Sequence, residues 1–330
     1  MFTIITVGDI HISDTNPRAR IDDFKESIMD KLEQVRLTSL KLKADAVVLV
    51  GDLFNLKNPS KNPHSLVREL IELFRSFKCP VYMIPGNHDL TADRLESLKE
   101  QPLGVLFASG SVINLSQEEI KKDGKRVSLV GIPYMDDLDV SSITFPPKDD
   151  CLAQLCVMHV YAGPEKGKLF KERLYGYDEL ATMGADIYVI GHYHVDQGIT
   201  EIDNKIFINL GSISRGTIAE ENINHKPKIG IIKISEIDGK PSIKAESMLL
   251  KVKSVNEIFD LVKRDEEKRE SEEIQKYVDK LAEKLIFNPS PISPANDNKE
   301  NMNDIIEGMN ITQIIKNKVL YYLQEAAAGK

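Results

Sequence analysis

The ten residues VYMIPGNHDL (81–90) combine an apolar run with three adjacent polar side chains. The run Val81–Ile84 predicts a strand inside the protein. A Pro-Gly pair ends it, and Asn87, His88 and Asp89 follow at once. Burying an amide, an imidazole and a carboxylate without partners is costly. The stretch therefore predicts that these groups hold, or react with, something at the end of a buried strand.

The composition is that of a globular protein. The chain has 330 residues, of which 42% are hydrophobic and 28% charged, enough for one large domain plus an appendage. No apolar run approaches the roughly 18 residues of a membrane span, so we expect no membrane association. A cleaved leader would remove Asp9 and His11, which the site below requires, so we expect none. Three cysteines without a C-x-x-C pair suit a reducing, cytoplasmic location.

The net charge limits the function classes. A formal charge of −8 argues against a protein that coats nucleic acid, because such proteins are usually basic. It is compatible with a nuclease whose positive potential is local and partly supplied by metal ions.

Short apolar, β-branched runs alternate with helical patterns until about residue 195. This alternation favours an α/β sheet, and the nearly continuous apolar runs fit strands that are covered on both faces. We predict helices over about residues 21–43 and 63–77. The predicted strands are Phe2–Val7, Ala46–Val50, Val81–Ile84, Val127–Ile132, Leu155–Met158, Ile187–Ile190, Ile206–Leu210 and Ile229–Ile234.

The sequence changes character after residue 250. Residues 1–250 form the predicted main domain, and a capping-box pattern at Ser254–Glu257 opens a charged helical segment over 251–286. The Pro-rich, polar stretch 287–302 is typical of a linker, and 303–330 carries an apolar stripe at helical spacing. This last helix docks either on its own domain or on a partner, and both alternatives stay open.

Five predicted strands deliver metal-capable side chains at their carboxyl ends, the edge where ligand sites of open α/β sheets form. The two-residue spacing of Asp9 and His11, and of His192 and His194, points both members of a pair the same way from an extended backbone. The full set is Asp9, His11, Asp52, Asn87, His88, His159, His192 and His194. Each motif alone is weak, but five in this order at strand ends are a strong signal.

The donor types indicate the metal. Carboxylate oxygen with imidazole nitrogen and no thiolate suits Mn²⁺, Fe²⁺ or Zn²⁺ and disfavours Ca²⁺ or a structural zinc site. Without His88, the set has seven candidate ligands. Seven are too many for one ion with an open position, so two ions about 3.5–4 Å apart with Asp52 between them fit better. Two divalent cations and two carboxylates leave a net positive site. An anionic substrate such as a phosphate ester fits that charge.

These motifs, D-x-H, G-D, G-N-H-D, H and G-H-x-H over about residues 4–215, resemble the calcineurin-like metallophosphoesterase superfamily. The resemblance implies a four-layer αββα fold, a β-sandwich flanked by helices, with a small C-terminal helical extension. It implies catalytic roles for His88, which would act on the transition state or leaving oxygen, and for Asp89, which would orient His88. It also implies two metal-ligand sets, one of Asp9, His11, Asp52 and His194 and the other of Asp52, Asn87, His159 and His192.

Within the superfamily, VGDIHISD, GDLFNLKNPS and GNHDL resemble the SbcD-type DNA-repair nuclease subunit, the partner of an SMC-like coiled-coil ATPase. The resemblance implies a Mn²⁺-dependent exonuclease or endonuclease that acts on DNA in repair and recombination. Residues 251–286 would then be a reduced cap and 303–330 the ATPase-docking helix. A homodimer is a further possibility for the assembly.

Three residues outside the ligand set are candidate substrate contacts. Asn55 stands where that family often has His, which leaves exonuclease and endonuclease activity both open. Ser212 and Arg215 in NLGSISRG lie near the active edge, where Arg215 would meet a phosphate or form an ordinary salt bridge.

Two alternative functions are a small-molecule phosphodiesterase or phosphatase and a non-catalytic metal-binding scaffold. The complete ligand set together with His88 and Asp89 weighs against the scaffold.

Overall fold

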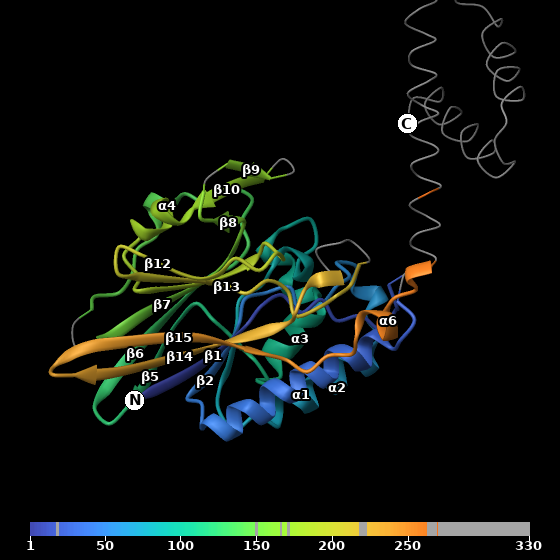
Figure 1. The fold of residues 1–330 in the computed structure, drawn as a ribbon, viewed down its shortest axis with the longest axis horizontal. Coiled ribbons are helices and arrows are strands. Elements are labelled where there is room, and N and C mark those ends of the chain that lie inside the picture. The colour runs from blue at the N-terminus through green and yellow to red at the C-terminus, as the bar shows by residue number, and fades with distance from the viewer. Residues whose placement is uncertain are drawn as a thin grey trace, which may run out of the picture. The chain divides into compact units, whose positions relative to one another are not determined.

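Two six-stranded sheets stack in the computed structural model of this chain (Figure 1). The structure describes residues 1–17, 20–148, 151–165, 167–169, 172–217, 223–262 and 269. Residues Met1–Phe259 form one compact unit, which holds all of the elements below.

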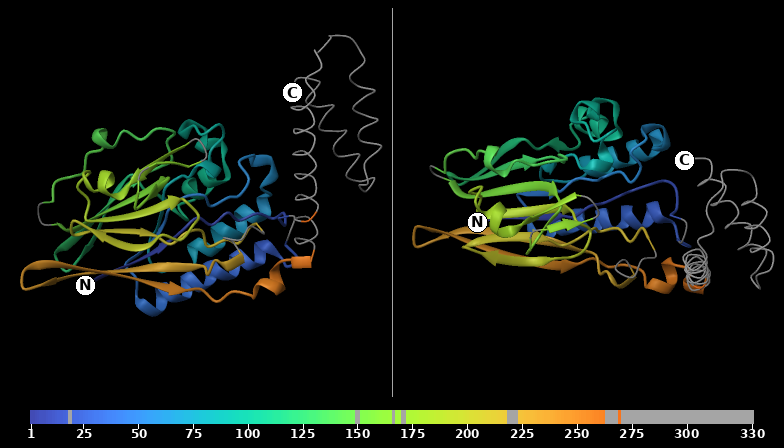
Figure 2. Two further views of the ribbon diagram at one scale, coloured as in Figure 1. Left: turned by 45° about the horizontal axis from the view of Figure 1, so that its top comes forward. Right: turned by 90° about the horizontal axis from the view of Figure 1, so that it is seen from above.

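The first sheet has the order β15-β14-β1-β2-β3-β4. Its strands β1 to β4 run parallel, whereas β14 and β15 are antiparallel additions that extend beyond β1 as a long hairpin (Figures 1 and 2). The strands are β1 (Phe2–Val7), β2 (Ala46–Leu49), β3 (Val81–Met83), β4 (Ile113–Asn114), β14 (Lys228–Ile237) and β15 (Lys240–Leu249).

The second sheet has the order β12-β13-β11-β7-β6-β5. Its four central strands run parallel, and its two edge strands pair antiparallel. The strands are β5 (Gln117–Lys122), β6 (Lys125–Ile132), β7 (Cys151–Val160), β11 (Ile187–His192), β12 (Gly198–Ile202) and β13 (Lys205–Asn209). A small sheet of β8 (Ala162–Gly163), β10 (Glu172–Gly176) and β9 (Gly167–Leu169) follows β7.

The helices cover the outer faces of the two sheets. Side chains of α1 (Phe24–Leu42), α2 (His64–Arg75) and α3 (Pro102–Ala108) share one apolar cluster with the first sheet. Side chains of α4 (Tyr177–Ala181) share another with the second sheet. Short helices complete the unit: η1 (Pro59–Lys61), η2 (Asn87–Asp89), η3 (Leu95–Glu100), η4 (Val140–Ser142) and α6 (Val255–Ile258).

A third apolar cluster fills the space between the sheets. Ile4 and Val48 from the first sheet and Leu155 and Val189 from the second belong to it. Their chain neighbours Ile5 and Val47 belong to the outer cluster under α1 and α2, because successive side chains of a strand point to opposite faces. Strand β1 is therefore buried along its whole length. The predicted αββα architecture is confirmed.

The predicted strands and both predicted helices occur. Helix α1 begins at Phe24 because the Asp23 side chain accepts a hydrogen bond from Glu26 N, 2.9 Å away, as an N-cap. The predicted capping box at Ser254 is also confirmed, with Ser254 N 2.8 Å from Glu257 Oε2, although α6 has only four residues.

The C-terminal predictions stay predictions. Beyond residue 262 the structure describes only residue 269, so the boundaries 251–286, 287–302 and 303–330 and the ATPase-docking helix lie largely outside the described residues. None of the helices in the described part of the chain is long and apolar enough to cross a membrane.

The layer between the sheets predicts a clear contrast in stability. Ile4 is fully buried in that layer, whereas Ile237 at the end of β14 is 56% exposed. Ile4→Ala should lower the free energy of unfolding by about 2–5 kcal/mol through lost burial and a cavity. Ile237→Ala should change it by less than about 0.5 kcal/mol. Urea denaturation of both variants tests this, and equal losses would contradict the two-sheet core.

Candidate metal centre

The candidate ligands gather where parallel strands of both sheets end. Asp9 and His11 follow β1, Asp52 follows β2, and Asn87 follows β3 across a Pro-Gly turn. From the other sheet, β7 contains His159, β11 ends at His192, and His194 follows directly. Because the two sheets are stacked, these carboxyl ends form one edge of the sandwich.

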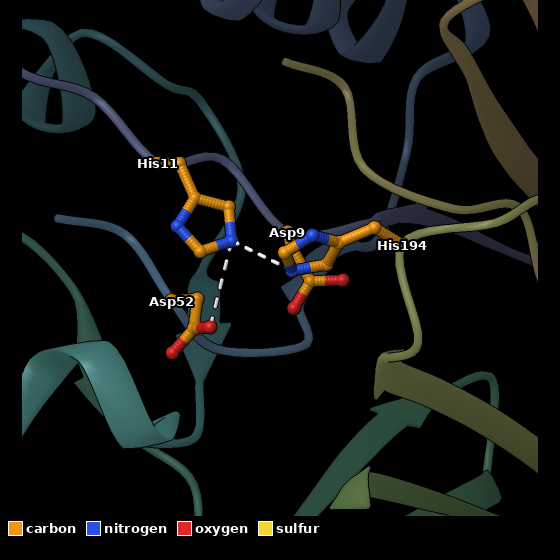
Figure 3. A group of neighbouring side chains, drawn as sticks. All are labelled: Asp9, His11, Asp52 and His194. Carbon is orange, nitrogen blue, oxygen red and sulfur yellow. Dashed lines mark hydrogen bonds and ion pairs between the residues drawn. The ribbon is translucent and has the colours of Figure 1, made fainter. Parts of the chain in front are cut away.

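Four side chains form a first group: Asp9, His11, Asp52 and His194. Their ligand atoms all lie within 4.8 Å of one another (Figure 3). His11 Nε2 lies 2.9 Å from His194 Nε2 and 3.5 Å from Asp52 Oδ2. His194 is exposed, and the other three are buried.

A second group shares Asp52 with the first and adds His159 and His192, again with ligand atoms within 4.8 Å of one another. His159 Nε2 lies 3.4 Å from Asp52 Oδ2 and 3.2 Å from Asn87 Oδ1, which brings Asn87 beside this group. The other ring nitrogen of His159, Nδ1, lies 2.8 Å from the carbonyl oxygen of Val50 and donates its proton there. This bond fixes the tautomer and leaves Nε2 as a metal-binding atom.

The residues present fit two divalent cations. Asp9 Oδ2 and Asp52 Oδ2 are buried and have no hydrogen-bond partner. Leaving buried carboxylate oxygens unpaired is costly, and coordination to a cation would remove that cost. The donors are carboxylate oxygens, an amide oxygen and imidazole nitrogens, the set that Mn²⁺, Fe²⁺ and Zn²⁺ accept. The shared Asp52 is the natural bridge between two such ions.

The electrostatics of the groups also favour cations. Burial and the neighbouring His194 imidazole lower the pKa of His11 well below its usual value, so this ring is neutral and has a lone pair to offer. Burial alone would lower the pKa of His159, but the carboxylates of Asp52 and Asp9 outweigh it and raise the pKa to about 9. A cation that binds His159 must therefore displace a proton.

The backbone around the site is strained at candidate ligands. His11, Asp52 and His192 have φ values of 51°, 49° and 78°, in the left-handed region that non-glycine residues avoid. Such conformations concentrate at functional sites, where surrounding structure enforces them. Gly86 is required beside Asp52, because a Cβ on it would lie 2.2 Å from Asp52 Oδ1.

The structure contradicts the expected role of Asp89, which was to orient His88. Its buried carboxylate does not pair with His88 as expected. It accepts hydrogen bonds from three backbone N–H groups, those of Gly86 at 3.0 Å, Phe54 at 3.2 Å and Leu53 at 3.3 Å. Asp89 thus ties the loop after β2 to the loop after β3. Burial and the nearby Asp52 carboxylate raise the pKa of Asp89 to about 7.

His88 belongs to neither ligand group and lines a pocket of about 580 Å³ beside them, together with His11 and His194. Its Nδ1 lies 2.8 Å from the carbonyl oxygen of Asn55, to which it donates. That bond leaves Nε2 as the ring atom available to a substrate. Asn55 lines the same pocket, in agreement with its expected place near the substrate.

The other two expected substrate contacts are wrong, because both side chains are buried and support backbone. Ser212 is 3% exposed, and its Oγ donates to the carbonyl oxygen of Asp9 at 2.8 Å. Arg215 is 4% exposed, and its Nη2 donates to the carbonyl oxygen of Lys253 at 2.6 Å. Ser212 thus fixes the backbone at a candidate ligand, and Arg215 holds the segment that precedes α6.

Two residues at the second group carried no signal in the sequence. Glu172 of β10 places Oε2 2.9 Å from His192 Nε2, and the Tyr161 ring centroid lies 4.0 Å from that of His192. Both come from the stretch between β7 and β11, which has no recognisable motif and whose strand β10, ERLYG, has no continuous apolar run. Only the fold brings them to His192.

A comparison with protein families places the chain. Residues 2–196 match the family model described as calcineurin-like phosphoesterase, so the chain belongs to that family.

Several curated proteins are similar to the chain. An uncharacterized metallophosphoesterase, YhaO of Bacillus subtilis, is 25% identical over 59% of this chain and 49% of its own length. The DNA double-strand break repair protein Mre11 of Saccharolobus solfataricus is 22% identical over 67% of this chain and 58% of its own. The Mre11 protein of Archaeoglobus fulgidus is 24% identical over 65% and 50%. The chain thus spans about half the length of these relatives.

Solved structures add only distant likeness. A dimetal phosphatase from Danio rerio aligns with 76% of this chain and 99% of its own, at 11% identity and a TM-score of 0.46. Vps29 complexed with zinc from Entamoeba histolytica aligns with 75% and 99%, at 15% identity and a TM-score of 0.33. These scores are too low to support a functional conclusion.

The two interpretations of Asp89 predict different outcomes for Asp89→Asn. The asparagine would turn an amide N–H₂ toward at least one backbone N–H donor and leave that donor unpaired. We expect the free energy of unfolding of metal-free protein to fall by about 1–3 kcal/mol. The imidazole ¹⁵N chemical shifts of His88 should stay unchanged, because its ring hydrogen bond to Asn55 remains. Urea denaturation and NMR spectroscopy measure the two quantities.

Asp123→Asn is the matched control, because Asp123 is exposed in a turn at a φ of 53° that asparagine tolerates. Unchanged stability of Asp89→Asn together with altered imidazole ¹⁵N chemical shifts of His88 would support the carboxylate–histidine pair instead.

Proposed function

We propose that the chain is a Mn²⁺-dependent DNA phosphodiesterase, an exonuclease or endonuclease that acts in DNA repair and recombination. The observation that carries the phosphodiesterase activity is the pair of ligand groups that share Asp52, beside a pocket lined by the non-ligand His88. The choice of DNA is supported by the similarity to Mre11 proteins named for DNA double-strand break repair and by the sequence resemblance to SbcD-type nucleases.

The charge of the site favours an anionic substrate such as a phosphate ester. Two divalent cations would bring four positive charges, against the two negative charges of Asp9 and Asp52. When bound, the cations supply positive charge to the phosphoryl oxygens and acidify the attacking water. Asp9, His11 and His194 would hold one cation. Asn87, His159 and His192 would hold the other, and Asp52 would contact both.

His88 supplies the proton chemistry. Its Nδ1 proton is committed to the carbonyl oxygen of Asn55, so the ring orientation is fixed. The backbone N–H of His88 donates to Asp52 Oδ1 at 2.8 Å, which ties the position of this residue to the shared carboxylate. A protonated Nε2 can donate to the phosphoryl oxygen or to the leaving oxygen, the role of a general acid.

His88→Ala tests the proposed function. With Mn²⁺, we expect the wild type to cleave single-stranded DNA and supercoiled plasmid, and EDTA to abolish cleavage. His88→Ala should cut kcat by about 10²–10⁴-fold, the usual contribution of a general acid, while Mn²⁺ binding measured by calorimetry stays at the wild-type stoichiometry. His64→Ala is the matched control, because His64 is exposed at the start of α2 and does not line the pocket beside the metal centre.

The substrate panel separates the alternatives. It includes bis-p-nitrophenyl phosphate and p-nitrophenyl phosphate besides DNA. Rapid hydrolysis of these esters with DNA left intact would contradict the nuclease and favour a small-molecule phosphoesterase. DNA cleavage that persists at full rate in His88→Ala would contradict the assigned role of His88.

A further inference from the structure

The pocket beside the metal centre extends well past the ligand groups. Its volume of about 580 Å³ lies within the roughly 300–1,000 Å³ range of pockets that bind whole drug-sized ligands, and it far exceeds the need of one phosphate group. Its described lining comes from three segments: residues 11–17 together with Phe24 after β1, residues 55–61 after β2 and residues 214–217 after β13. A substrate bound at the metals therefore meets protein on several further sides.

The lining is complementary to a polyanion. Of the described residues that line the pocket, none is Asp or Glu, although 51 of the 330 residues are acidic. Thr15, Asn16 and Asn55, which are exposed or partly exposed, offer neutral polar groups. Phe24 is the one Phe, Tyr or Trp among these described lining residues, and at 1% exposed it cannot stack on a base. Contacts of this kind suit a phosphate backbone more than base edges or base faces.

Lys61 is the only Lys or Arg among the described lining residues, and its side chain is exposed at the end of η1. Its backbone N–H donates to the carbonyl oxygen of Asn58, whereas its ammonium group has no hydrogen bond or ion pair with any described residue. Two other lysines of this region are neutralised: Lys57 Nζ lies 2.6 Å from Asp93 Oδ1, and Lys25 Nζ lies 3.2 Å from Glu69 Oε2. Among the described residues that line the pocket, Lys61 therefore carries the one positive charge with no paired carboxylate.

The loop that carries Lys61 is held in place before any ligand binds. The Asn58 side chain accepts the Ser60 N–H at 3.0 Å and caps η1. The Asn62 side chain, 5% exposed, donates from Nδ2 to the carbonyl oxygen of Leu56 at 2.8 Å. A fixed loop lowers the ordering cost of binding, so a single lysine on it can contribute measurably.

We propose that Lys61 binds a backbone phosphate of a single DNA strand, one that flanks the phosphodiester held at the metal centre. This inference rests on the proposed DNA substrate and defines the path of the strand, from His88 across Asn55 to Lys61. A monophosphate ester or a small diester has no second phosphate and gains nothing from this lysine. The proposed substrate class is therefore a polynucleotide. The protein would contact its phosphate backbone and have little preference for particular bases.

Salt dependence tests the proposal quantitatively. Log affinity falls as log salt rises, and each lysine–phosphate contact on single-stranded DNA makes this negative slope steeper by about 0.7. Lys61→Ala should make the slope shallower by about 0.7, which corresponds to affinity losses of about eightfold at 50 mM salt and about threefold at 200 mM. Fluorescence anisotropy with a labelled 20-nucleotide strand and Mn²⁺ measures this, in a His88→Ala background that prevents cleavage.

Two matched variants control the experiment. Lys61→Arg keeps the charge and should keep the slope. The double variant Lys57→Ala/Asp93→Asn removes a lysine of the same loop together with the carboxylate that pairs with it, so the local net charge is unchanged and it should bind as the parent does. In enzyme that retains His88, Lys61→Ala should lower kcat/KM about fivefold to tenfold more for the DNA strand than for bis-p-nitrophenyl phosphate at low salt.

The failures are distinguishable. If the wild type cleaves DNA but Lys61→Ala binds it with the parental affinity and salt slope, the path across Lys61 is wrong and the proposed function stands. If the wild type hydrolyses small diesters but neither binds nor cleaves DNA, the DNA substrate and the path across Lys61 are both overturned.

Discussion

The carboxylate of Asp52 is the constraint on which the rest of the site depends. It is fully buried, and its Oδ2 lies 3.5 Å from His11 Nε2 and 3.4 Å from His159 Nε2, one from each sheet of the sandwich. Its Oδ1 accepts the backbone N–H of His88. Burial alone would raise the pKa of Asp52, but the imidazoles of His159 and His11 outweigh it and hold the pKa below its usual range. A buried carboxylate that stays charged at this point would be stabilised by bound cations.

The surrounding backbone is organised to keep Asp52 there. The residue has a left-handed φ of 49°, and the preceding Gly51, with a φ of 112°, leaves no room for a Cβ against His159. Asp89 clamps the two loops that flank Asp52 through three backbone hydrogen bonds. Strain at Asp52 and His11 is sustained because buried strands on both sides determine where these loops begin and end.

Much of this arrangement could be predicted from the sequence, and the physical reasons are specific. Strand β1 is buried on both faces and therefore appears as a run of apolar and β-branched residues, FTIITV, and the order of polar residues after such runs indicates one shared edge. Edge strand β5, Gln117–Lys122, was not predicted, because its mostly exposed and charged side chains leave no apolar pattern. The direction in which a side chain points could not be predicted from the sequence either. Asp89 and Arg215 turn to backbone partners that only the folded loops create.

Crystals of the chain soaked in Mn²⁺ provide the most direct test of the central claim, that one carboxylate serves two cations. An anomalous difference map recorded at the manganese edge should show two peaks about 3.5–4 Å apart. Asp52 should lie between them, with Asp9, His11 and His194 around one peak and Asn87, His159 and His192 around the other. A single peak, or two peaks that do not share Asp52, would contradict the account.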